Sequence, residues 1–454
     1  MSAYRPDPAI LDLGHKFFDV VAPADFPETT LRYRDDVAAS DIGLAHLSDA
    51  EWIAHFARFE PLPDNLGTEG RPGPLALRYH GHQFRQYNPD LGDGRGFLFA
   101  QVRDAEDRLL DLGTKGSGRT PWSRDGDGRL TLLGGVREVL ATRYLQHMGV
   151  NTSRSLSLVE TGESLHRGDE PSPTRSSVLV RLSHSHIRFG TFQRLYALNL
   201  PDAMEALVAY CIRHFHTGAE DAAGLLRAVV AASADTVASW MAAGFVHGVM
   251  NTDNMNITGE SFDYGPYRFL PHLDPGYTAA YFDRHGLYGF ARQPQAMAWN
   301  LGQLAQALSL VADDAALVAA LDDFAGLYRD ALSAHTLRRL RLSPVDSEVD
   351  AATTSAWLGW LEASRANWPW AWHDLRGGPG QLAPAGSPNA GLYRGEAFED
   401  LLVHLRRHAP HGPVPPGLPA TLLYEEIGAL WEPIARDDDW SAFHAKLDTF
   451  ARPS

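Results

Sequence analysis

The sequence predicts an α+β protein, with strands and helices mixed in the first half and helices filling the second. Two strand-like segments, Phe97–Val102 and Leu109–Lys115, flank a short polar turn and indicate neighbouring strands. After residue 200, apolar residues recur at the helical period over Asp202–His216 and Ala222–Ala243. The change from strand-like to helical pattern near residue 200 therefore divides the chain.

We expect three parts along the chain. Residues 1–75 are rich in Pro and Asp, carry one short helical pattern at Asp49–Phe59, and are expected to wrap around the rest. Residues 76–200 form the mixed part. Residues 201–454 form the helical part, which includes a long helix over Asp314–Leu340 and a C-terminal extension. We interpret five tryptophans of this extension as core residues: Trp357, Trp360, Trp368, Trp370 and Trp372.

Composition narrows the classes of function. The net charge of −16 argues against general binding to nucleic acid or to an anionic membrane. The only cysteine, Cys211, excludes an intramolecular disulfide and a multi-cysteine metal site. The N-terminal stretch lacks the pattern of a signal peptide, and no stretch is judged long and apolar enough to span a membrane. We therefore expect a cytoplasmic protein with no membrane partner.

The segment Gly81–Gly96 is rich in turn-forming residues. Within it, Gly92, Gly94 and Gly96 alternate with Asp93 and Arg95. Glycines at this spacing allow backbone N–H groups to approach a phosphate closely. Taken alone, the cluster predicts only a tight hairpin turn.

The residues that follow add to this signal. Lys115 ends the second predicted strand, and Glu138 lies in the first turn of a predicted helix, Val136–Met148. Alone, each has an ordinary interpretation, a solvated lysine and a helix-capping carboxylate. However, glycine turn, strand, strand with Lys and helix with Glu is the order of a protein-kinase small lobe, in which the Lys reaches the phosphates and the Glu orients it. The ordered set predicts a nucleotide site.

Two further segments carry candidate phosphate-binding residues. Asp127 and Gly128 belong to a second glycine-containing turn. Arg181 lies in a predicted strand, Ser177–Ser183, and Arg188 follows in the next loop. Arginine suits bidentate contact with phosphate, although a surface position on strand and loop is an equally open interpretation.

The polar stretch His247–Gly265 follows a helical pattern and aligns with kinase catalytic elements. The kinase catalytic loop reads H-R-D-x-x-x-x-N, and a D-F-G follows. Here His247 takes the first position, Asn254 the metal-binding position, and Asp263 begins the D-Y-G. Val249 stands where a kinase has its catalytic Asp, and it cannot accept a proton. Asp253 is an acid with no kinase counterpart, so we expect a retained nucleotide–metal site with altered chemistry.

Several motifs taken in order resemble the selenoprotein O (YdiU) family. They are GHQF followed by LGDGRG, TKGSGRTPWSRDGDGR, VREVLA, RLSHSHIRFGTF, and HGVMNTDNM followed by DYGP. The resemblance covers about Gly81 to Pro266 and, more loosely, nearly the whole chain. It implies a bilobal protein-kinase-like fold, with a mixed small lobe and a helical large lobe. It also implies transfer of AMP from a flipped ATP to Ser, Thr or Tyr hydroxyls of proteins, with release of pyrophosphate.

The resemblance also implies roles for single residues. Glu138 would pair with Lys115, and Asp253 would accept the proton of the incoming hydroxyl. Asn254 and Asp263 would bind Mg²⁺ or Mn²⁺, which prefer such oxygen ligands. The implied nucleotide-binding residues are Gly92, Gly94, Arg95, Lys115, Asp127, Gly128, Arg181, Arg188 and Asp263.

One family feature is absent from this chain. Many members carry a cysteine or selenocysteine near the C-terminus, whereas this chain ends in LDTFARPS. A redox role at that position therefore does not carry over.

Two other functions stay open at this point. A kinase with a displaced catalytic acid would use the same ATP and metal, but Val249 counts against it. A nucleotide-binding scaffold without activity has no chemical need to keep Lys115 together with Asn254. The sequence does not identify the target proteins, among which the enzyme itself is a candidate, nor the preference for ATP over UTP, nor the oligomeric state.

Overall fold

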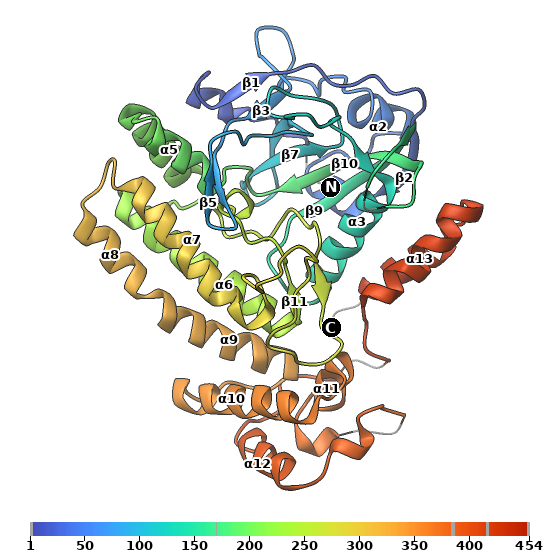
Figure 1. Ribbon diagram of the computed structural model, residues 1–454, viewed down its shortest axis with the longest axis vertical. Coiled ribbons are helices and arrows are strands. Elements are labelled where there is room, and N and C mark those ends of the chain that lie inside the picture. The colour runs from blue at the N-terminus through green and yellow to red at the C-terminus, as the bar shows by residue number, and fades with distance from the viewer. Residues whose placement is uncertain (1–2, 169, 383–385, 415–416, 452–454) are drawn as a thin grey trace.

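The computed structural model describes residues 3–168, 170–382, 386–414 and 417–451 (Figure 1). The two ends of the chain, which begin and finish the predicted 1–75 and 201–454 parts, thus lie outside the described residues. The α+β class is confirmed: an eight-stranded sheet fills the upper part of Figure 1, and helices form the lower part. Every pairing in the sheet is antiparallel.

The sheet has the strand order β1-β3-β6-β7-β10-β9-β2, with β8 paired to β10. Both ends of this order, β1 and β2, come from the N-terminal segment. The two predicted strands are present as β6 and β7, the first shifted by one residue. The bounds are β1 (Phe18–Val20), β2 (Thr30–Arg34), β3 (Leu75–Leu77), β6 (Leu98–Arg103), β7 (Leu109–Lys115), β8 (Leu130–Thr131), β9 (Arg154–Leu165) and β10 (Thr174–Ser183).

Alternation along the strands gives the sheet two buried faces. In β10, Leu179 packs with the cluster that contains helix α3 (Leu132–His147). Its neighbours Val178 and Val180 instead pack with the N-terminal helices α1 (Asp36–Asp41) and α2 (Asp49–Phe56). Successive side chains of a strand point to opposite faces, so one strand serves both cores.

The remaining helices follow the sheet in sequence. They are α4 (Phe189–Ala197), α5 (Pro201–His214), α6 (Ala222–Ala243), α7 (Gln293–Leu308), α8 (Asp314–Asp322), α9 (Phe324–Leu340), α10 (Ser347–Ser364), α11 (Trp368–Asp374), α12 (Glu396–Leu405), α13 (Tyr424–Asp437) and α14 (Ser441–Phe450). Short 3₁₀ turns and two small hairpins complete the fold: η1 (Ala9–Leu13), η2 (Thr252–Asn254), η3 (Phe290–Arg292), η4 (Pro379–Gln381), η5 (Ala390–Leu392), β4 (Gly81–Gln83) with β5 (Gln86–Asn88), and β11 (Phe245–Val246) with β12 (Arg268–Phe269).

Two predictions about helices were wrong. The single helix expected over Asp314–Leu340 is two helices, α8 and α9, which meet at Asp323. Acidic residues at the C-terminal end of α8 oppose its dipole, and Asp is a poor helix former, so the break falls there. Helix α6 is long and apolar enough to cross a membrane by length and composition, contrary to the prediction, but 67% of its most apolar window is buried inside the protein. We assign α6 as a core helix.

The tryptophan-rich extension forms a second core beneath α9. Trp357, Trp360, Trp368 and Trp372 are buried there, which confirms their interpretation as packing residues. The fifth, Trp370, is only partly buried.

Candidate active site

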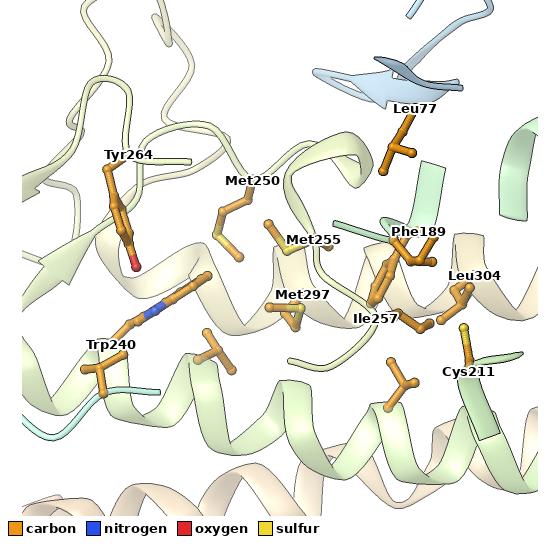
Figure 2. Packing of buried hydrophobic residues seen from close by; sticks show 14 of the residues in the cluster. Leu77, Phe189, Cys211, Trp240, Met250, Met255, Ile257, Tyr264, Met297 and Leu304 are labelled. Carbon is orange, nitrogen blue, oxygen red and sulfur yellow. The ribbon is translucent and has the colours of Figure 1, made fainter. Parts of the chain in front are cut away.

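The stretch 247–265 leaves β11 and returns to the sheet pair at β12, and its apolar side chains fix it to the helical core. Figure 2 shows Met250, Met255 and Ile257 among residues of α6 and α7, such as Trp240 and Met297. All three loop residues are buried. Because these side chains are anchored, the polar residues between them are held in fixed positions.

A cavity of about 660 Å³ lies between this loop and the end of the sheet. Its walls carry seven Lys or Arg side chains against five Asp, although the whole chain is strongly acidic. The lining residues are Tyr79, Gln83, Leu91, Gly92, Asp93, Gly94, Arg95, Gly96, Phe97, Gly113, Thr114, Lys115, Trp122, Ser123, Arg124, Asp125, Gly126, Asp127, Gly128, Arg129, Arg167, Arg181, His186, Arg188, Asp253 and Asp263.

Lys115 is held between two carboxylates. Its Nζ donates to Oε1 of Glu138 on α3 and, at 2.9 Å, to Oδ1 of Asp263. Arg181 on β10 donates to the same two residues, at 3.2 Å to Glu138 and 3.1 Å to Asp263. Glu138 is 2% exposed and lies behind Lys115, so it reaches the cavity through its cationic partners.

Asp263 is the centre of this network. Arg188, the residue that precedes α4, adds a third cation, with its Nη1 3.2 Å from Oδ2. Burial alone would raise the pKa of Asp263, but Lys115, Arg181 and the other nearby charge hold that pKa well below its usual range. The ring of Phe262 lies beneath both guanidinium groups, at 5.5 Å from Arg181 and 4.8 Å from Arg188.

Asp253 lies in the 3₁₀ turn η2 at the opposite side of the loop. It is 8% exposed, and its Oδ1 has no hydrogen-bond partner among the described residues. Burial raises the pKa of its carboxyl to about 6, although Arg188 acts in the opposite direction. Arg188 also donates to the backbone carbonyl of Asp253 at 2.8 Å, which ties the two halves of the site together.

The β4–β5 hairpin braces the turn that carries Asp253. The backbone N–H of His82 donates to Oγ1 of Thr252 at 2.7 Å, and that of Phe84 donates to Oδ1 of Asn251 at 3.0 Å. Gly81 lies so close that a Cβ there would be 3.1 Å from the Cβ of Asp253. The reversal of the hairpin falls at Phe84 and Arg85, both with positive φ, rather than at the glycines.

The predicted glycines line the cavity for reasons of packing. A Cβ on Gly92 would lie 2.3 Å from the indole of Trp122, so only glycine lets this segment approach the loop that follows β7. Gly128 has φ of 71° and would meet Gly118 at 2.2 Å. Its neighbour Asp127 accepts two hydrogen bonds from Arg167, at 2.8 and 3.0 Å.

Asn254 is the predicted site residue that does not line the cavity. Its Nδ2 donates to the carbonyl of Val249 at 2.9 Å, which fixes the side-chain amide within the loop. No group of three or more His, Cys, Asp or Glu among the described residues forms a complete metal cage. The oxygen donors present, the Asp263 carboxylate and the Asn254 amide, fit Mg²⁺ or Mn²⁺, which bind through few protein ligands together with phosphate and water.

Sequence reasoning assigned no role to four residues of the site. Asp93 accepts from Arg188 at 3.4 Å and from the N–H of Leu77 at 3.0 Å, and burial raises the pKa of its carboxyl. Tyr79 lies 4.7 Å beneath the guanidinium of Arg188. Arg167 and Phe262 complete the walls. Only Asp93 had a usable signal, its position between two glycines of a motif.

The fold and the site together define a nucleotide-handling enzyme class, and comparison with known proteins identifies the family. A profile described as "Protein adenylyltransferase SelO" matches residues 2–380. The chain is 44% identical over 98% of its length to a protein nucleotidyltransferase YdiU of Gloeobacter violaceus, of which it covers 95%. It is 43% identical over 96% of its length to the YdiU of Synechocystis sp., of which it covers 96%. The chain belongs to the SelO family of protein adenylyltransferases, which confirms the resemblance drawn from the motifs.

Proposed function

We propose that this protein transfers AMP from ATP to Ser, Thr or Tyr hydroxyls of proteins, in a reaction that requires Mg²⁺ or Mn²⁺. The observation that carries the proposal is the position of the acid. Val249 removes the kinase base, while Asp253 offers an unpartnered carboxylate oxygen at the cavity wall opposite the cluster of cations. The names of the relatives, protein nucleotidyltransferases, support the same class of reaction.

The reaction forms one bond and breaks one bond at the α-phosphorus. The hydroxyl oxygen attacks the α-phosphorus, and the bond to the oxygen that bridges the α- and β-phosphates breaks, so pyrophosphate leaves. Asp253 accepts the hydroxyl proton on Oδ1. Lys115, Arg181 and Arg188 neutralise the phosphates, which is the main requirement of such transfers.

A metal would be held by Asp263 and Asn254. When bound, it supplies positive charge to the phosphate oxygens. Without the nucleotide, three cations already share Asp263, and they hold its carboxylate ionised and oriented toward the cavity. Asp263 therefore orients the phosphate-binding cations as well as a metal.

We extend the proposal to the arrangement of the chain. Residues 76–200 would form the small lobe of a kinase-like fold, residues 201–454 the large lobe, and residues 1–75 a segment packed on both. The cavity supports this division, since Lys115 comes from the sheet and Asp253 from the loop anchored in the helices. A cytoplasmic location belongs to the same proposal.

The test uses ATP labelled on either the α- or the γ-phosphate, incubated with the protein, Mg²⁺ or Mn²⁺ and candidate target proteins. Label should enter protein, the enzyme itself included as a candidate, only from the α-position. Asp253→Asn should reduce this transfer by about 100- to 10,000-fold, the usual contribution of a general base. Exposed Asp90, changed to Asn, serves as the matched control and should transfer normally.

Other outcomes point to the other functions. Incorporation from the γ-label would establish a kinase. Tight ATP binding with no transfer of either label, across a broad set of proteins, would establish a scaffold.

A further inference from the structure

A second cavity, of about 530 Å³, is lined by five arginines and one aspartate, and neither the motifs nor the proposed reaction uses it. We call it the arginine pocket. It lies where the end of α3 meets the end of α9 and the last turn of α14. Its lining residues are Asp35, Val37, Arg143, Gln146, His147, Met148, Gly149, Arg154, Arg338, Arg339, Arg341, His411, Phe450 and Ala451.

Two of the arginines donate to backbone carbonyls at helix ends. Arg338 donates to the carbonyl of Gly149, just after α3, at 3.1 Å, and Arg339 donates to the carbonyl of Ala242 in the last turn of α6. Arg339 also stacks on Trp372, with its guanidinium carbon 4.3 Å from the ring centre. The guanidinium groups are thus fixed in position, and each has further N–H donors beyond the one that its carbonyl accepts.

Carboxylates offset only part of this charge. Asp35 pairs with Arg143 at 3.3 Å, and Asp41 pairs with Arg154 at 2.6 Å. Within the described ranges, no carboxylate lies within 4 Å of Arg338 or Arg339. Burial lowers the pKa of the Arg339 guanidinium to about 9, and the neighbouring Arg338 adds to that effect, so the group is still charged at neutral pH.

The helix ends offset a further part of the charge. The C-termini of α3, α6 and α9 meet at the arginines, and each contributes roughly half a negative charge. Capping these ends is the simplest structural role for the arginines. Yet the three ends and two carboxylates still leave roughly one to two positive charges in the pocket. That excess matches a phosphate group, which carries about 1.5 to 2 negative charges at pH 7.

We propose that the arginine pocket binds the phosphate group of a small anion, either free phosphate or a phosphate monoester. Arginine forks suit bidentate contact with phosphate oxygens. Gln146, whose Oε1 is buried without a hydrogen-bond partner among the described residues, gives the pocket an acceptor for a hydroxyl of an organic ester. The bound anion would join α3, which carries Glu138, to α9.

Calorimetric titration of the full chain tests the site, with inorganic phosphate and ribose 5-phosphate as probes. Arg338→Gln and Arg143→Gln come from opposite walls of the pocket, and each should weaken binding of both probes at least tenfold. Arg329→Gln, nine residues earlier on the same helix and exposed, is the matched control and should bind both probes normally. Circular dichroism of the free variants checks that each is folded.

Lys115→Met separates this pocket from the active cavity. Phosphate binding should survive in that variant, because Lys115 lies in the other cavity. Tighter binding of ribose 5-phosphate than of phosphate identifies an organic ester as the ligand, and equal binding identifies free phosphate. Binding that Lys115→Met abolishes and Arg338→Gln leaves intact overturns the proposal, as does the absence of any binding by the unchanged protein.

Discussion

Two cationic regions of the molecule hold their charges in different ways. In the active cavity, Lys115, Arg181 and Arg188 share the buried carboxylate of Asp263. In the arginine pocket, Arg338 and Arg339 donate to backbone carbonyls instead. A carboxylate carries a full charge and a helix end about half of one. The active cavity is therefore nearer to neutral before a ligand binds, which suits a nucleotide that arrives with its own metal, whereas the arginine pocket suits an anion alone.

The same loop shows what a bound cation does for a buried carboxylate. Glu260 and Asp263 lie three residues apart, and their pKa values move in opposite directions. Glu260 accepts hydrogen bonds from the Ser183 hydroxyl and the N–H of His184, but no cation lies within 4 Å of it in the part of the chain that the structure describes. Burial therefore raises the pKa of Glu260 to about 7.

The largest stability effect that we expect in this comparison comes from Glu260. Because its folded pKa is raised, its contribution to stability is complete below about pH 4.5 and is lost as the pH rises through about 7. Glu260→Gln keeps an acceptor oxygen for both donors and cannot ionise. It should raise the free energy of unfolding at pH 8.5 by about 1 to 3 kcal/mol and leave it nearly unchanged at pH 4. Denaturant titration at the two pH values measures this, and equal effects at both would contradict it.

Next in size is the coupling between Lys115 and Glu138. Each single change, Lys115→Met or Glu138→Gln, leaves a buried charge with one partner fewer. The double change should cost less than the sum of the two by about 1 to 3 kcal/mol in the free energy of unfolding. A double-mutant cycle by chemical denaturation gives this number. Losses that add within about 0.5 kcal/mol would show that the contact carries no coupling.

Removing the carboxylate that the cations share should make the active cavity resemble the arginine pocket. In Asp263→Asn, Lys115 and the two arginines lose a full negative neighbour. Metal-free ATP, measured in the presence of a chelator, should bind about tenfold more tightly, or about 1.4 kcal/mol. Transfer of AMP in the presence of metal should fall sharply at the same time. Weaker binding of metal-free ATP would mean that Asp263 orders the cations more than it neutralises them.

The smallest effect belongs to the arginine pocket. Arg338 lies outside the active cavity and contacts the end of α3 through a backbone carbonyl. Arg338→Gln should therefore leave the rate of AMP transfer within about twofold of normal in phosphate-free buffer. A larger loss there would show that the two regions are coupled even without a bound anion.

Local patterns account for what the sequence could predict. Strands β6 and β7, and the alignment of Asn254 and Asp263 with kinase elements, depend on residues near one another in the chain. The contacts of Lys115 with Glu138 and Asp263 were expected only in part, because the motif order gave the first partner and not the second.

Long-range contacts account for what was missed. The brace from the β4–β5 hairpin to η2 joins residues about 170 apart in sequence. The arginine pocket gathers side chains from α3, β9 and α9, and each arginine alone is an ordinary helix or strand residue. The glycines of the cavity were assigned to phosphate contact, whereas Gly92 is needed because Trp122 packs against it.

Trp122 also gives the protein an optical reporter. Among the residues that the structure describes, it is the one tryptophan that lines the active cavity, and its indole N–H donates to Asp19 at 3.0 Å. A nucleotide that enters beside Gly92 would change the polarity around this ring, and with it the intrinsic fluorescence. Occupancy of the cavity could then be followed with unlabelled ATP, and a Trp122→Phe variant would supply the background from the buried tryptophans of the extension.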